Sequence, residues 1–285
     1  LRIKQGKEPW QLSMGKLKLK SAFSTETANL LVVQMTSPDR ILILGGTHEA
    51  ANLAEKLNNI FQDRLEIIYS LAGRIKPIRK TTIAVRIGGF GGCSGLINFI
   101  ISEKIKFIID ATHPFAEKIS RNAYDASVAT EIPRLTLIKP CWDLPASAKF
   151  IEVNDMRHAA NTLEKFSKRV LVTTGKSDLD CLNKLTSIHF FIRVFEKTKN
   201  EKNTKNFTFF TGCPPFEIDQ EQALLEEHNI DTLLTKHSGG TQTVSKIIAA
   251  YRKKIPIVMI RRPPPEPGEI ANNIEEAIIW LKRKL

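Results

Sequence analysis

The chain has 285 residues, a length that suits two domains of roughly 100–150 residues each. Hydrophobic residues make up 42% and charged residues 25%, close to the globular average, which excludes collagen, mucin and wholesale disorder. No apolar run reaches the roughly 18 residues that a membrane span needs. The 4 cysteines lie far apart with no Cys-x-x-Cys pair, which argues against a zinc ribbon, an iron–sulfur run or a disulfide framework and favours a reducing cytoplasm.

The net charge is +12, from 42 Lys and Arg against 30 Asp and Glu, and it favours anionic partners. Part of the excess lies in residues 1–35, which hold six basic and two acidic residues. They show no strand or helix period and make a poor secretory signal, although a transit peptide is an alternative. We expect residues 1–37 to be a basic N-terminal extension, disordered unless it docks on the body, with Met35 as a natural start.

From Arg40 onward, short apolar β-rich runs alternate with amphipathic segments. Strands are expected over 41–44, 65–70, 82–87, 107–110 and 134–138, and helices over 49–60, 95–104 and 115–130. Residues 139–148 contain two prolines and are interpreted as a linker.

The same alternation continues after the linker. Strands are expected over 150–153, 170–173, 190–194, 207–211, 232–235 and 257–260, and helices over 155–166, 177–185, 219–228, 241–252 and 270–284. Apolar strands that alternate with helices predict parallel sheets covered on both faces. We therefore predict an α/β protein with two doubly wound Rossmann-like domains, residues 38–143 and 144–285, that face each other across a cleft.

In such sheets, ligands bind beyond the carboxyl ends of the strands. The first predicted strand is followed by Gly45, Gly46 and Thr47 and then by a helix. Glycine lets the backbone approach a phosphate, and the helix start offers free N–H groups. The pattern is not G-x-G-x-x-G, however, and a tight turn with Thr47 as the N-cap is the alternative.

The next two loops suggest which nucleotide would bind. A NAD site places an acid after its second strand, but this chain has Ser70 followed by Arg74, which suits the 2′-phosphate of NADPH. An Arg74 that is merely solvated is the alternative. The loop with Gly88, Gly89 and Phe90 suits close passage beside a flat cofactor, or a flexible hinge.

Two further groups of loop residues carry candidate chemistry. Thr112 and His113 follow the fourth strand and are candidate cofactor-binding residues. The histidine is a candidate to donate a proton near a nicotinamide, and the alternative is that either residue caps the next helix. In the second half, two loops combine backbone donors, hydroxyls and a lysine, which suits an acidic substrate or two simply capped helices. Their candidate binding residues are Thr174, Gly175, Lys176 and Ser177, and then Lys236, Ser238, Gly239 and Gly240.

With these loops in their order, the chain resembles the precorrin-6A reductases of cobalamin biosynthesis (the CobK/CbiJ family). The resemblance covers about residue 38 to the C-terminus. The segments that carry it are Ile41-Leu42-Ile43-Leu44-Gly45-Gly46-Thr47-x-Glu49-Ala50, Ser70-Leu71-Ala72-Gly73-Arg74, Arg86-x-Gly88-Gly89-Phe90-Gly91-Gly92, Asp110-Ala111-Thr112-His113-Pro114-Phe115-Ala116, Thr173-Thr174-Gly175, Lys236-x-Ser238-Gly239-Gly240 and Pro256-x-Val258-Met259-Ile260-x-Arg262-Pro263.

The resemblance implies that NADPH reduces one double bond of precorrin-6A, or of its cobalt form, to give precorrin-6B. It implies an NADPH-binding amino-terminal domain and a second domain that binds the polycarboxylate, tetrapyrrole-derived substrate. We expect direct hydride transfer without a metal. His113 and His237 are candidate proton donors, and a bound water or the substrate's own acid groups are the alternatives. His237 departs from the family, which usually has asparagine there.

Two other functions remain open. One is a different NADPH-dependent reductase of the same fold, such as a small-carbonyl reductase. The other is a non-enzymatic nucleotide-sensing or nucleic-acid-binding protein, although only 7% of residues are aromatic and no nucleic-acid module is recognised. We expect a cytoplasmic enzyme with neither nucleic acid nor membrane as partner.

Overall fold

A computed structural model describes residues 37–73, 83–142, 149–176, 179–196 and 203–285. The chain divides into two units, Leu1–Ser37 and Pro38–Leu285. The expected disorder of the N-terminal extension, the role of Arg74 and the role of Ser177 fall outside the described residues. Within the described part, no helix combines the length and apolar character that a membrane crossing requires.

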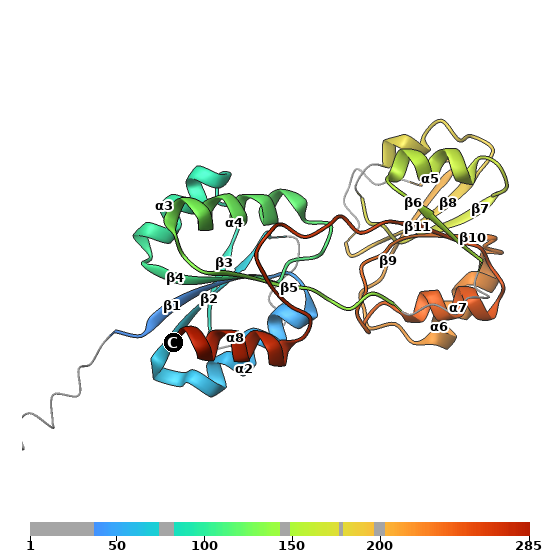
Figure 1. The fold of residues 1–285 in the computed structure, drawn as a ribbon. Helices are drawn as coiled ribbons and strands as arrows, with labels where there is room; N and C mark the ends of the chain where they lie inside the picture. The colour runs from blue at the N-terminus through green and yellow to red at the C-terminus, as the bar shows by residue number, and fades with distance from the viewer. Residues whose placement is uncertain (1–36, 74–82, 143–148, 177–178, 197–202) are drawn as a thin grey trace, which may run out of the picture. The chain divides into compact units, whose positions relative to one another are not determined.

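The first sheet has six parallel strands in the order β12-β5-β4-β1-β2-β3 (Figure 1). Its strands are β1 (Asp39–Leu44), β2 (Leu65–Leu71), β3 (Ala84–Ile87), β4 (Ile105–Asp110), β5 (Arg134–Leu137) and β12 (Glu269–Ala271). Its helices are α2 (His48–Phe61), α3 (Cys93–Ser102), α4 (Glu117–Thr130) and α8 (Ile274–Lys284), with a 3₁₀ turn η1 (Gln62–Arg64).

Both faces of this sheet are covered because side chains alternate along each strand. On β1, Ile41 and Ile43 join a core with α2 and α8, whereas Leu42 and Leu44 join a core with α3 and α4. Figure 1 shows these helix pairs on opposite faces of the sheet.

The second sheet repeats the plan with strand order β6-β11-β10-β7-β8-β9, again all parallel. Its strands are β6 (Phe150–Val153), β7 (Arg169–Val172), β8 (His189–Val194), β9 (Phe207–Thr211), β10 (Thr232–Lys236) and β11 (Ile257–Ile260). Its helices are α5 (Met156–Leu163), α6 (Ile218–Glu227) and α7 (Ser245–Arg252), with a 3₁₀ turn η2 (Leu179–Leu182). The predicted pair of doubly wound α/β sheets is therefore confirmed; the cleft stays a prediction.

The C-terminal segment corrects the predicted domain division, which assigned all of 144–285 to the second domain. Residues Glu269–Ala271 form β12, which pairs with β5 in the first sheet. The predicted helix over 270–284 consequently begins only at Ile274, capped by Asn273. Leu281 is fully buried and the Trp280 ring meets Phe107 edge-on at 6.3 Å, so burial of apolar surface holds this segment on the first sheet.

Two further differences concern the second sheet. The helix expected over 177–185 is described only as the short turn η2, and the helix expected over 241–252 begins at Ser245. The later start of α7 lengthens the loop after β10, at the carboxyl edge of this sheet.

Candidate active site

The strand order of the first sheet changes direction between β1 and β4, and the predicted first and fourth loops meet there. The amide of Gly45 donates to Ser70 O at 2.9 Å, and the amide of Ala111 donates to Leu44 O at 3.0 Å. The Thr47 hydroxyl donates to Ala111 O at 2.9 Å. The loops after β1 and β4 and the end of β2 are thus tied together at the edge where α/β sheets bind ligands.

The Gly45–Thr47 turn has the shape of a nucleotide-binding turn. Thr47 Oγ1 accepts a hydrogen bond from Ala50 N at 3.1 Å and caps α2, as the alternative interpretation expected. A Cβ at Gly45 would lie 2.3 Å from the Tyr69 ring, whereas a Cβ at Gly46 (φ 108°) would meet no atom within 4 Å. The capped helix start and the open space at Gly46 fit a bound pyrophosphate.

Tyr69 was not predicted for this turn. Its hydroxyl accepts a hydrogen bond from Gly46 N at 3.3 Å, and burial raises the pKa of the phenol. Tyr69 lies in β2 as one half-buried residue of a regular strand, so no sequence signal distinguished it.

The predicted residue after β2 is buried, whereas the predicted glycines after β3 border open space. Ser70 is buried inside β2, which extends one residue further to Leu71. A Cβ at Gly88 or Gly89 would meet no atom within 4 Å, so there is room beside the backbone of this loop. Phe90 is packed by the guanidinium of Arg86, 3.8 Å from its ring centroid. Arg86 also donates to Gly89 O at 2.9 Å and so fixes the loop.

After β4, the side chains form a local hydrogen-bonded turn. Thr112 donates from its amide (3.1 Å) and its hydroxyl (2.7 Å) to Asp110 Oδ1. Asp110 is 2% exposed, and its Oδ2 has no hydrogen-bond partner among the described residues. Helix α4 begins after Ala116, so neither Thr112 nor His113 is its N-cap residue.

His113 is a neutral base in this arrangement. Loss of surrounding solvent, followed by the charges of Lys139, Lys236, Lys246 and Arg262, lowers the pKa of His113 from 6.5 to about 3. Part of the side chain remains exposed, and all four cations act on it in the same direction. The ring Nδ1 accepts a hydrogen bond from Phe115 N at 3.3 Å, which places the ring proton on Nε2.

The loop after β10 is shaped by Arg262, a residue that the sequence did not assign to the site. Its guanidinium donates to His237 O (3.1 Å), Ser238 O (2.8 Å) and Lys139 O (2.7 Å). A Cβ at Gly239 would lie 2.2 Å from Pro140 O, so this predicted glycine is required for close packing. The supposed linker residues 139–142 are therefore part of the site.

Two side chains of that linker make specific contacts. Lys139 Nζ lies 2.6 Å from Glu49 Oε2 on α2. Trp142 Nε1 donates to Gly240 O at 2.7 Å, and its ring stacks on His237 at 5.7 Å. Burial, and then the charge of Arg262, lowers the pKa of His237. His237 is thus held by ring stacking beside the loop.

The other predicted binding residues of the second half lie at the carboxyl ends of β7 and β10. Thr174 is buried, Gly175 has φ 79° with open space around it, and Lys176 is exposed. Lys236 Nζ lies 5.0 Å from the ring centroid of Phe115, which follows β4. Lys139 of the first sheet's side and Lys236, Lys246 and Arg262 of the second sheet's side thus all act on His113.

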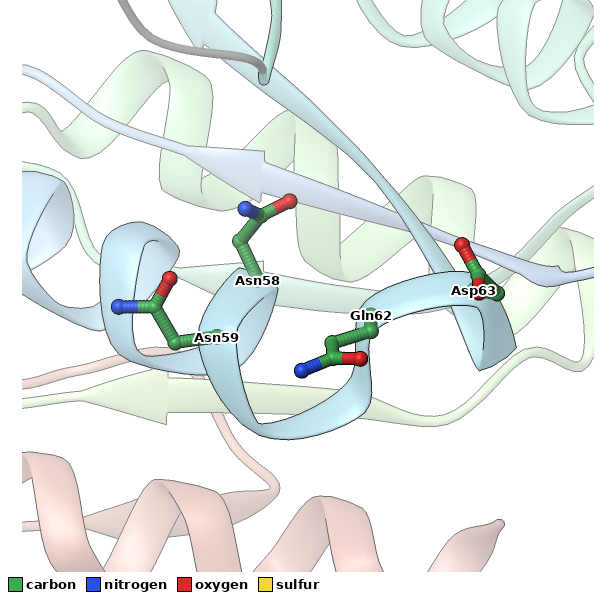
Figure 2. Close-up of a pocket in the computed structure, with 4 residues that line it drawn as sticks. All are labelled: Asn58, Asn59, Gln62 and Asp63. Carbon is green, nitrogen blue, oxygen red and sulfur yellow. The ribbon is translucent and has the colours of Figure 1, made fainter.

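A separate hollow of about 500 Å³ lies elsewhere, lined by Asn58, Asn59, Gln62 and Asp63 (Figure 2). It lies between the end of α2 and the start of β2. This is the edge of the sheet opposite the Gly45–Thr47 turn. It has no part in the site described above. No cluster of three metal-ligating side chains occurs in the described ranges.

Comparison with known proteins places these loops in context. The family described as "Precorrin-6x reductase CbiJ/CobK" matches residues 40–282. The chain is 39% identical to a precorrin-6A reductase of Rhodococcus erythropolis, over 85% of this chain and 97% of that protein. It is 26% identical to a cobalt-precorrin-6A reductase of Priestia megaterium, over 84% and 96%. A solved structure titled "CobK precorrin-6A reductase" superposes with a TM-score of 0.79 at 29% identity, covering 86% of this chain and 96% of that one.

Proposed function

This chain belongs to the CbiJ/CobK family of precorrin-6x reductases, and on that premise we propose that it reduces precorrin-6A to precorrin-6B in cobalamin biosynthesis, with NADPH as the hydride donor. The observation that carries the proposal is the family match over residues 40–282, combined with the tied loops after β1 and β4. The chain is accordingly an oxidoreductase that acts on a tetrapyrrole-derived macrocycle.

The first sheet is the proposed cofactor-binding part, made of residues 38–143 together with β12 and α8. The turn Gly45–Thr47 and the start of α2 would hold the pyrophosphate, since amide donors and the helix dipole favour anions. Gly88 and Gly89 leave space for the ring systems. Arg74 remains our proposed partner of the 2′-phosphate, with Ser70 supporting from within β2. The coenzyme, when bound, supplies the hydride.

The second sheet, residues 150–260, is the proposed substrate-binding part. The loops after β7 and β10 offer Thr174, Gly175, Lys176 and Ser177, and Lys236, Ser238, Gly239 and Gly240. Lys236 and Arg262 belong to the cations that act on His113. A macrocycle with many carboxylates is attracted and oriented by such a positive region.

His113 is the proposed proton-handling residue. Burial first, and then the charges of four neighbouring cations, lower the pKa of His113 and keep the imidazole neutral. Bound substrate carboxylates would offset those cations and raise the pKa of His113, so that the ring becomes able to give a proton in the complex. His237 has less support for this role, because its ring stacks on Trp142.

We favour metal-free precorrin-6A over the cobalt form. Relatives named precorrin-6A reductase are 30–39% identical to this chain, and those named cobalt-precorrin-6A reductase are 25–26% identical. We further propose that the enzyme works in the cytoplasm, a compartment that suits its four free cysteines.

The test is NADPH oxidation with precorrin-6A and cobalt-precorrin-6A side by side, followed through the absorbance of both chromophores. We expect turnover with the metal-free substrate, with a higher kcat/KM than for the cobalt form, and preference for NADPH over NADH. Turnover of simple carbonyl compounds with no activity toward either macrocycle would refute the proposal and support the carbonyl-reductase alternative.

A further inference from the structure

The side chain of Tyr69 reaches from β2 to the turn that follows β1. The two strands are parallel neighbours, and Tyr69 lies opposite Ile43 in their register. Its ring packs against the core that the sheet forms with α2 and α8. Its hydroxyl oxygen lies 3.3 Å from Gly46 N, and a Cβ at Gly45 would lie 2.6 Å from the same oxygen. The phenol is therefore held at the turn from two sides.

Three hydrogen-bond donors of this turn are already engaged by the protein itself. The amide of Gly45 donates to the backbone of β2 at 2.9 Å. The amide of Gly46 donates to the Tyr69 hydroxyl, and the Thr47 hydroxyl donates to Ala111 O at 2.9 Å. A coenzyme phosphate could use these donors only if a bond within the protein were broken.

The proton of the Tyr69 hydroxyl is a donor that remains available. A hydroxyl can accept and donate at the same time, and Tyr69 accepts from Gly46. Among the described residues, its own proton has no acceptor. Burial raises the pKa of Tyr69, so the phenol keeps this proton at neutral pH. A hydroxyl that accepts one hydrogen bond also becomes a stronger donor in the next.

Two other roles for Tyr69 explain less of this geometry. Packing alone accounts for the ring, but a phenylalanine would fill the same space without a hydroxyl at the turn. Alternatively, the hydroxyl occupies the place of a phosphate oxygen on Gly46 and must leave when the coenzyme binds. The ring is confined by Gly45 on one side, however, whereas a Cβ at Gly46 would meet no atom within 4 Å. The open space next to Gly46 therefore offers room for a ligand beside a phenol that stays in place.

We propose that Tyr69 is a coenzyme-binding residue whose hydroxyl accepts from Gly46 N and donates to the pyrophosphate, so that it relays the amide of the turn to the ligand. Hydrogen bonds to a charged acceptor are stronger than bonds between neutral groups, so this contact favours a ligand that carries a pyrophosphate. The inference rests on the proposed function only for NADPH as the coenzyme.

The test compares three ligands on the full chain by calorimetry: NADPH, ADP-ribose 2′-phosphate and 2′-AMP. The first two contain the pyrophosphate, and 2′-AMP does not. We expect Tyr69→Phe, which keeps the ring, to raise the Kd of the two pyrophosphate ligands by about 5–20-fold. The Kd of 2′-AMP should stay within about twofold. In steady-state kinetics the KM for NADPH should rise by a similar factor, with kcat nearly unchanged.

The matched control is Tyr124→Phe, which removes the same hydroxyl atom from α4 on the other face of the first sheet. It should bind all three ligands as the wild type does. The melting temperature of Tyr69→Phe should stay within about 4 °C of the wild type. If it falls further, the ligand comparison still decides, because general damage to the first sheet would weaken 2′-AMP as much as NADPH.

Three results would overturn the relay. They are an equal loss of affinity for all three ligands, wild-type affinity for NADPH in Tyr69→Phe, and tighter binding of NADPH in that variant. The last result would show that the hydroxyl competes with the pyrophosphate for Gly46.

The relay and the proposed function fail separately. Tyr69-dependent binding of NADPH without turnover of precorrin-6A would support the relay and refute the proposed function. Turnover of precorrin-6A with an affinity for NADPH that does not depend on Tyr69 would do the reverse.

Discussion

The guanidinium of Arg262 donates to the carbonyl oxygen of Ser238 at 2.8 Å, so the segment that follows β11 fixes the conformation of the loop after β10. Its other two bonds reach His237 O and Lys139 O. One side chain therefore organises two segments of the candidate site.

Arg262→Met should lower the free energy of unfolding by about 2–4 kcal/mol, because half-buried carbonyls lose a charged donor. Arg262→Lys should lower the free energy of unfolding by less, since lysine keeps the positive charge but lacks the planar guanidinium geometry. Denaturant titration measures the loss, and the KM for precorrin-6A should rise together with it. An unchanged midpoint in Arg262→Met would contradict the role of this residue.

Gly45→Ala should destabilise the protein by about 1–3 kcal/mol and weaken NADPH binding, because its Cβ would enter the Tyr69 ring. The double variant with Tyr69→Leu should recover part of the stability, since the ring atoms that clash are removed. Thermal unfolding and NADPH titration check both effects. Normal stability of the Gly45→Ala single variant would contradict this prediction and would mean that the Tyr69 ring moves aside freely.

Leu281→Ala should cost about 2–5 kcal/mol and weaken NADPH binding, although the residue is four positions from the chain's last residue. The reason is that α8 packs in the core of the first sheet. The control is Leu163→Ala, at an equally buried leucine of α5 in a core of the second sheet, and it should leave the Kd for NADPH nearly unchanged. Equal weakening of NADPH binding in Leu281→Ala and Leu163→Ala would contradict this prediction and would indicate that the two sheets unfold as one unit.

The free protein should show no protonation of His113 between pH 5 and pH 8, because its pKa is lowered to about 3. A group protonated in the unfolded chain near pH 6.5 and not in the folded chain costs stability as the pH falls below 6.5. His113→Gln should flatten this slope, with His158→Gln as the exposed control. Imidazole titration by NMR measures the pKa directly, and a value near 6.5 in the free protein would contradict the assignment.

If His113 gives the proton, His113→Gln should lower kcat by about 10²–10⁴-fold with little change in NADPH affinity. Steady-state kinetics and cofactor titration separate these effects. Unchanged turnover would exclude the residue from proton transfer.

The strands could be predicted well because they are short apolar runs with clear ends. The ranges expected for 207–211 and 257–260 coincide with β9 and β11. Strand β12 was missed because three residues, Glu269–Ala271, show no period, and its partner β5 is more than a hundred residues away in the sequence. Pairing at such a distance leaves no local signal.

The part of the site that lies directly after the strands could be predicted, because parallel strands bring their carboxyl ends to one edge of the sheet. Thr47 and Ala111 meet for this reason. Lys139, Trp142 and Arg262 could not be assigned, because their segments have the composition of a linker and of a proline-rich tail. Their contacts with residues 237–240 depend on how the chain returns through space.

The pairing of β12 with β5 also has a consequence for biogenesis. While the ribosome is still making the chain, the first sheet lacks an edge strand and the helix that covers Phe107, whereas all six strands of the second sheet have been made. The half of the protein that is synthesised first is therefore the half completed last, and its exposed apolar face must avoid aggregation until residues 269–284 emerge.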